Sequence, residues 1–99
     1  MTDIEIIKKC ADRMDYKVAL DIHGTFFFVT DGTKQPERHD YNPLTDDAQA
    51  MALVRRFNIC IDQGRFDHCC ASIRQLNIIY SATSPDLNRA ICECVARLP

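Results

Sequence analysis

This sequence of 99 residues has no apolar run close to the ~20 residues that a membrane-spanning helix needs. Its start also lacks a basic segment leading into an apolar stretch, which is the pattern of a secretory signal peptide. We therefore expect a protein that neither spans a membrane nor is secreted. Its expected location is the reducing environment of the cytoplasm.

Neither sign of charge dominates the chain. There are 12 Lys and Arg residues against 14 Asp and Glu residues, which gives a net charge of −2. Proteins held on nucleic acid mainly by phosphate contacts need a clear basic excess, so we expect no nucleic-acid partner. The half from residue 51 onward is mildly basic and all its basic residues are arginine. We interpret that half as a solvated surface, with an acidic protein partner as the alternative.

Established catalytic motifs are missing as well. The sequence contains no glycine-rich phosphate loop, no Gly-x-Ser-x-Gly and no His-Glu-x-x-His. His39-Asp40 is a dipeptide found in some metal-dependent phosphohydrolases, but His23 and His68 are expected in a turn and a strand, away from it. We therefore predict that the protein is not an enzyme, holds no metal and needs no cofactor.

Cysteine is abundant, with six residues: Cys10, Cys60, Cys69, Cys70, Cys92 and Cys94. In a reducing compartment these are expected to be free thiols that act as small apolar residues. Their spacing does not match a zinc knuckle, because neighbours on a strand point to opposite faces. We expect Cys94 in the core, and Cys92 with one of Cys69 or Cys70 at the surface.

Hydrophobic residues make up 46% of the chain and charged residues 26%, as in an ordinary globular protein, and the length suits a single domain over residues 1–99. Three segments show the three- and four-residue apolar spacing of amphipathic helices. They are residues 3–14, 46–57 and 85–99. Thr2 and Glu5 have the spacing of a capping box before the first segment, and Ser84-Pro85 is typical of a helix start before the third.

Five shorter segments are rich in β-branched and aromatic residues, as strands are. They are residues 18–22, 25–30, 58–62, 66–73 and 76–81. Turn signals such as His23-Gly24 and Gln63-Gly64 separate them, which predicts antiparallel pairing. Residues 33–43 show little periodicity and are predicted to form the one substantial loop.

Several predicted strands are apolar on both faces, as in Phe26–Val29, Ile59–Ile61 and Ile78–Tyr80. Both faces of the sheet would then need cover. The expected fold class is α+β: an α/β/α layered sandwich, with one antiparallel sheet and three helices covering both faces. The alternative is that a second subunit covers one face.

The stretch Tyr41-Asn42-Pro43-Leu44-Thr45-Asp46-Asp47, followed by a helix, a strand meander and a last helix with Ala90-Ile91, resembles the phage ABA sandwich domain family. The resemblance covers about residues 41–98. It implies helix/sheet/helix layering and an origin in a bacteriophage or prophage, with a role in the host cell cytoplasm. The family has no established activity, so the resemblance implies no mechanism.

We expect a small non-enzymatic binding protein that engages or inhibits a host factor, such as a host defence complex. The alternatives are a structural or assembly component of the phage and a small oligomeric ligand-binding protein. The expected partner is a host or phage protein, with a homodimer as a further alternative.

The candidate binding residues lie around the second predicted helix. Tyr41, Asp46 and Asp47 combine an aromatic ring with two carboxylates where a loop enters the helix, and loops held on rigid elements often carry binding sites. The alternative is that Tyr41 packs on the helix start while both acids only cap it. Arg55 and Arg56, at the opposite end of the helix, form the second candidate surface.

Overall fold

The computed structural model describes residues 1–29, 39–63 and 68–99. Most of the predicted loop 33–43 and the glycine of the predicted 63–64 turn lie outside these residues. The helices are α1 (Asp3–Arg13), α2 (Asp47–Phe57) and α3 (Leu87–Ala96). The strands are β1 (Val18–Leu20), β2 (Phe26–Phe28), β3 (Asp40–Tyr41), β4 (Cys60–Gln63), β5 (Cys69–Gln75) and β6 (Ile78–Ser84). The α+β class predicted from the sequence is confirmed.

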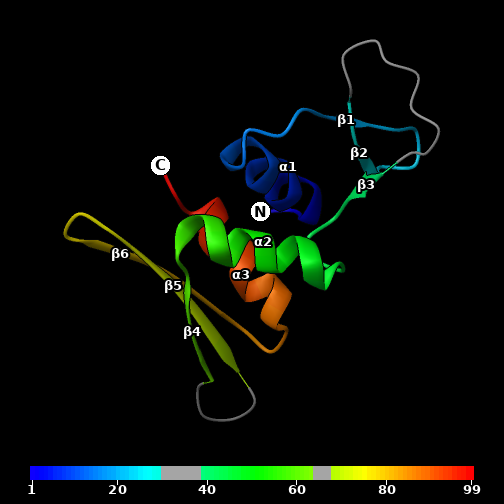
Figure 1. The fold of residues 1–99 in the computed structure, drawn as a ribbon. Helices are drawn as coiled ribbons and strands as arrows, with labels where there is room; N and C mark the ends of the chain where they lie inside the picture. Colours follow the sequence, from blue (N-terminus) through cyan, green and yellow to red (C-terminus); the bar gives the residue numbers. More distant parts are fainter. Residues whose placement is uncertain (30–38, 64–67) are drawn as a thin grey trace.

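The strands form two antiparallel sheets of three strands each, in the orders β1-β2-β3 and β4-β5-β6. Ala19 pairs with Phe27 in the first sheet, and Ala71 pairs with Ala82 in the second. This differs from the single sheet that the sequence predicts. The reason is that α2 follows β3 and carries the chain past α3 before β4 begins, so the two sets of strands never meet (Figure 1).

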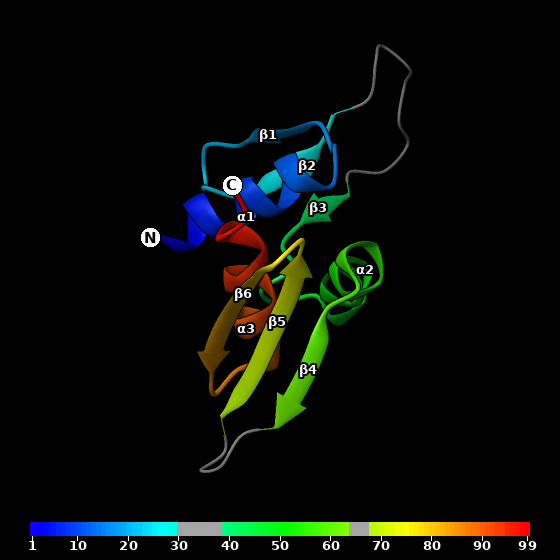
Figure 2. The same cartoon turned by 90° about the vertical axis from the view of Figure 1, so that its left-hand side faces the viewer.

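The helices lie between the two sheets, with β4–β6 on one side and β1–β3 on the other (Figure 1). Figure 2 shows β4, β5 and β6 in front of α3, and within the described part of the chain no helix covers their other face. The outer face of the β4–β6 sheet is therefore not covered by a helix. The expectation that helices cover both faces of this sheet is wrong.

Helix α3 is the centre of the core. It contacts β5, β6, α1 and α2, and most of its side chains are buried. A helix that is apolar around most of its circumference is typical of a core element. Alanines that are fully buried on the contacting elements allow close approach of the backbones: Ala11, Ala50, Ala71 and Ala90.

Two of the predicted helix starts are confirmed by their caps. The Thr2 hydroxyl accepts a hydrogen bond from the Glu5 backbone N–H at 3.2 Å, and the Asp46 carboxylate accepts one from the Gln49 N–H at 3.0 Å. Each cap satisfies a backbone donor that the first helical turn leaves without an internal partner.

The third helix begins later than predicted. Ser84 remains in β6, and Asp86 caps α3 by accepting a hydrogen bond from the Asn88 N–H at 3.0 Å. Asp86 has the extended backbone of an N-cap, with φ −97° and ψ 120°, and its carboxylate takes the capping role that Ser84 was expected to fill. The predicted cap at Ser84 is therefore wrong by two residues.

No helix in residues 1–29, 39–63 or 68–99 combines the length and apolar character needed to cross a bilayer.

Candidate functional site

The two predicted acidic residues lie at the start of α2, and both have structural partners. Asp46 is the N-cap of the helix. The Asp47 carboxylate accepts a hydrogen bond from the Asn88 side-chain amide at 2.8 Å, which joins α2 to the first turn of α3. Both side chains are exposed. The structure thus gives each carboxylate a role in holding the helices, as the capping alternative proposes for Asp46.

Tyr41 is buried, with 1% of its surface exposed, so it contributes no aromatic surface to solvent. Its ring lies edge-on to Tyr16 and Phe28, with centroids 5.5 and 5.4 Å away, and those two rings are 5.2 Å apart. This three-ring cluster joins the end of α1 to the β1–β3 sheet. Edge-to-face pairs at such distances are favourable beyond their burial of apolar area.

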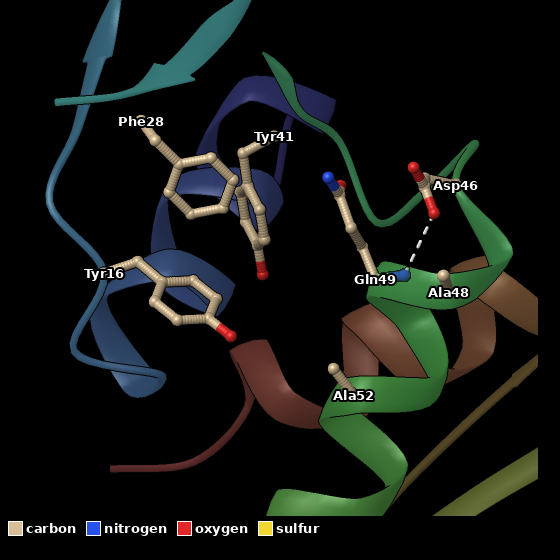
Figure 3. A pocket seen from close by; sticks show the side chains of 7 residues that line it. All are labelled: Tyr16, Phe28, Tyr41, Asp46, Ala48, Gln49 and Ala52. Carbon is tan, nitrogen blue, oxygen red and sulfur yellow. Dashed lines mark hydrogen bonds between the residues drawn. The ribbon is translucent and has the colours of Figure 1, made fainter. Parts of the chain in front are cut away.

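A pocket of about 320 Å³ lies between the aromatic cluster and α2. We call it the aromatic pocket; it is lined by Tyr16, Phe28, Tyr41, Asp46, Ala48, Gln49 and Ala52. Figure 3 shows the rings on one side of this space and α2 on the other. Ala48 and Ala52 are one helical turn apart, and their small side chains leave the space open.

Gln49 fixes the wall of the aromatic pocket. Its side-chain Oε1 accepts a hydrogen bond from the Asn42 N–H at 2.6 Å, and its Nε2 donates to the Asp40 carbonyl at 2.8 Å. Both ends of the amide are thereby used to tie β3 to α2. Because both ends of the Gln49 amide are hydrogen-bonded to backbone groups, this side chain has a structural role in the wall of the pocket.

The hydroxyl of Tyr41 is the unusual polar group here. It is buried and has no hydrogen-bond partner among the described residues. Burial, with smaller contributions from Cys10, Cys92 and Tyr16, raises the pKa of this phenol far above its ordinary value. The phenol therefore stays neutral at every physiological pH and can serve as a hydrogen-bond donor, not as a base.

The other predicted residues lie elsewhere. Arg55 and Arg56 are exposed in the last turn of α2, where cations interact favourably with the helix dipole. A guanidinium nitrogen of Arg56 lies 3.9 Å from a carboxylate oxygen of Asp15, and both side chains are largely in solvent, so this ion pair contributes little stability. The structure does not bring these arginines to the aromatic pocket.

A second surface feature, which sequence reasoning missed, is the end of the β5–β6 hairpin. Leu76 is 94% exposed, Ile78 54% and Ile79 65%. We call these three residues the hairpin end. Leu76 has φ 55°, in the left-handed region that a leucine side chain disfavours. The chain thus holds a large apolar side chain in solvent at a strained position, and strain of this kind is concentrated at functional sites.

Comparison of the chain with protein families, with curated proteins and with solved structures finds no match. The resemblance to the phage ABA sandwich domain family stays a prediction based on the residues alone.

The cysteines are all free. Cys92 is fully buried, which corrects the expectation that it lies at the surface: its side of α3 packs on α1, where the Cys10 thiol donates to the Cys92 carbonyl at 3.5 Å. Cys60, on the outer face of β4, is exposed instead. Among the described residues, no three His, Cys, Asp or Glu side chains are placed to hold a metal ion.

Thiol labelling checks this placement. At pH 8 we expect Cys60 to react quickly with Ellman's reagent, while Cys10, Cys92 and Cys94 react only after unfolding. Burial raises the pKa of Cys94 to about 11, so only about one molecule in a thousand carries the reactive thiolate at pH 8. Six thiols should react in denaturant. Fewer than six, or a Cys92 as reactive as Cys60, would contradict the structure.

Proposed function

We propose that this chain is a small non-enzymatic binding protein of a phage or prophage, which engages a protein of the host cell in the host cytoplasm through the hairpin end. The observation that carries the proposal is the exposure of Leu76 in the turn and of Ile78 and Ile79 at the start of β6, at the projecting end of the β5–β6 hairpin. Clustered apolar side chains in solvent are typical of protein-binding surfaces. Arg74 pairs with Ile79 across the hairpin and is exposed, so it adds a cation beside the apolar residues.

The chemistry of these residues describes the partner. An apolar hairpin end flanked by arginine fits an apolar groove with acidic residues at its rim, because arginine pairs well with carboxylates at interfaces. This agrees with the sequence-based alternative of an acidic protein partner for the basic half of the chain.

The size of the sheet favours such a groove over a flat homodimer. Three strands spaced at about 4.8 Å, with β5 seven residues long at about 3.3 Å per residue, give an outer face of about 330 Å². Stable interfaces bury about 800 Å² on each partner. The projected outer face is thus small for a dimer held by this face alone, whereas a groove that surrounds the hairpin end contacts both faces of the hairpin.

Leu76→Gly separates binding from stability. Glycine adopts φ 55° without strain, and Gly-Asn is a favoured hairpin turn, so we expect the free energy of unfolding to stay the same or rise by up to about 1 kcal/mol. Removal of the apolar side chain should lower partner capture at least tenfold, equivalent to about 1.4 kcal/mol. Affinity capture from host-cell lysate with quantitative mass spectrometry, and denaturant unfolding, measure the two effects.

Ile22→Gly is the matched control, because Ile22 is 95% exposed in the turn between β1 and β2, in the other sheet. It should leave capture unchanged. Capture that survives Leu76→Gly, or a wild-type protein that retains no host protein, would refute the proposal.

A further inference from the structure

We infer that the free edge of β6 is a strand-pairing surface for β6 of a second copy of this chain, and that Arg97 keeps this edge closed. The inference concerns self-association and does not depend on the function proposed above. It rests on the position of β6 at the edge of its sheet, on the composition of the strand and on one hydrogen bond from the end of α3.

The backbone of β6 presents hydrogen-bonding groups at its free edge. The strand pairs with β5, and among the described strands no other pairs with it (Figure 2). Gln75 and Ile78 are the outer residues of a two-residue turn, so the N–H of Ile78 is directed to β5. Pairs along an antiparallel ladder alternate, so Ile79, Ser81 and Thr83 direct their backbone groups away from β5. All three residues are exposed.

The sequence of β6, Ile-Ile-Tyr-Ser-Ala-Thr-Ser, lacks the features that usually protect an edge strand. Such strands carry lysine, proline or a bulge, or another element covers them. This strand has no charged residue, no proline and no glycine, and its register with β5 runs without a bulge. Segments of six or seven residues with this composition pair readily with copies of themselves. Protection of the edge must therefore come from elsewhere in the chain.

Arg97, the residue that caps the end of α3, supplies this protection. A guanidinium nitrogen lies 2.7 Å from the carbonyl oxygen of Ser81, which is the central residue of the three that face outward. A second strand would need this same carbonyl as an acceptor and would have to displace the guanidinium. Because hydrogen bonds with an ionised donor are stronger than those between neutral groups, this displacement is unfavourable.

A second β6 strand fits this edge once the guanidinium is removed. Antiparallel pairing centred on Ser81 places the two serines opposite each other and Ile79 opposite Thr83 of the other copy. The pairing uses the outward backbone groups of all three residues and places no like charges opposite each other. Both copies use the same edge, so the product is a closed dimer with two-fold symmetry.

Arg97→Ala tests the inference, with sedimentation velocity over a range of protein concentrations as the measurement. We expect the dimer dissociation constant to fall at least about tenfold, as fits the loss of a hydrogen bond from a charged donor. Arg55→Ala removes the same charge from an exposed position on α2 and should associate no more than the wild type. Arg97→Met, which keeps an apolar chain without the donor, gives the same test if Arg97→Ala does not fold.

A second substitution at Ser81 tests whether the edge is the contact. Proline lacks an N–H, and the N–H of Ser81 takes no part in the ladder with β5, so Ser81→Pro keeps the hairpin and blocks edge pairing. Added to Arg97→Ala, it should restore the dissociation constant of the wild type. If this double variant does not fold, Ser81→Lys replaces it, because pairing would place two lysines opposite each other.

Amide hydrogen exchange locates the contact. In concentrated Arg97→Ala we expect the amides of Ile79, Ser81 and Thr83 to exchange more slowly than in the wild type. The amides of Tyr80 and Ala82, which face β5, should be protected in both proteins.

Association that appears in Arg97→Ala, protects the outward amides and is lost on addition of Ser81→Pro supports the inference. The inference is wrong if Arg97→Ala associates no more than the wild type, or if Arg55→Ala associates equally. It is also wrong if Leu76→Gly reverses the association and Ser81→Pro does not, because the contact would then be the hairpin end.

Discussion

Ile91→Ala is expected to lower the free energy of unfolding by about 2–5 kcal/mol, the range for removing a large aliphatic side chain from a core. Ile91 is 0% exposed on α3, the helix that contacts both neighbouring helices and the β4–β6 sheet. The surroundings of such a site relax only partly around the cavity, so the loss includes packing contacts as well as transfer of apolar surface. In a domain of this size the melting temperature should fall by about 10 °C or more.

Ile79→Ala is the matched control, since the same side chain is removed at the exposed hairpin end. Its unfolding free energy should change by less than about 0.5 kcal/mol, while partner capture should fall. Denaturant unfolding of both variants, monitored by circular dichroism, provides the comparison. Equal losses of stability for the two variants would show that α3 is not the centre of the core.

Tyr41→Phe is expected to raise the free energy of unfolding by about 1–3 kcal/mol, which is the cost of burying an unsatisfied polar group. The ring contacts with Tyr16 and Phe28 are kept, and the group that is lost is a hydroxyl with no hydrogen-bond partner among the described residues. Tyr41→Ala should have the opposite sign and cost about 3–5 kcal/mol, because it removes the buried ring as well. Thermal and denaturant unfolding of the two variants measure these effects.

Tyr80→Phe supplies a control at a half-buried tyrosine, whose hydroxyl loss should change stability by less than about 0.5 kcal/mol. A Tyr41→Phe protein that is less stable than the wild type would mean that a tightly held water bonds to this hydroxyl.

Local features of the fold were predictable because short-range physics determines them. The spacing of Thr2 and Glu5 predicts the start of α1, and Asp46 predicts the cap of α2. Pairing between distant strands was not predictable in the same way. Nothing in the period of one strand indicates which other strand it will meet, so two small sheets and one larger sheet give the same local pattern.

The apolar run at Ile78 and Ile79 shows a second limit. In the sequence it is typical of a strand covered on both faces, but in the structure it begins β6 at the exposed end of the β5–β6 hairpin. Apolar patterning reports a preference for burial in general and does not distinguish burial in a core from burial against a partner. This ambiguity is the physical reason why the hairpin end was missed.

The aromatic pocket was only partly accessible to sequence reasoning. Tyr41 and Asp46 were singled out, and both line the pocket. Tyr16, Phe28 and Gln49 were not, because the first two come from elements far from α2 in the chain. In the sequence Gln49 is an ordinary helix residue, and only the structure shows its hydrogen bonds to the backbone of Asp40 and Asn42.

Photo-crosslinking from position 76 tests the central claim most directly, namely that the hairpin end is where a host protein binds. Benzoylphenylalanine in place of Leu76 should give one dominant covalent adduct in host cells, and the same residue in place of Ile22 should give none. Adducts formed from position 22 or from position 55, with none from position 76, would contradict the claim and place the binding surface elsewhere.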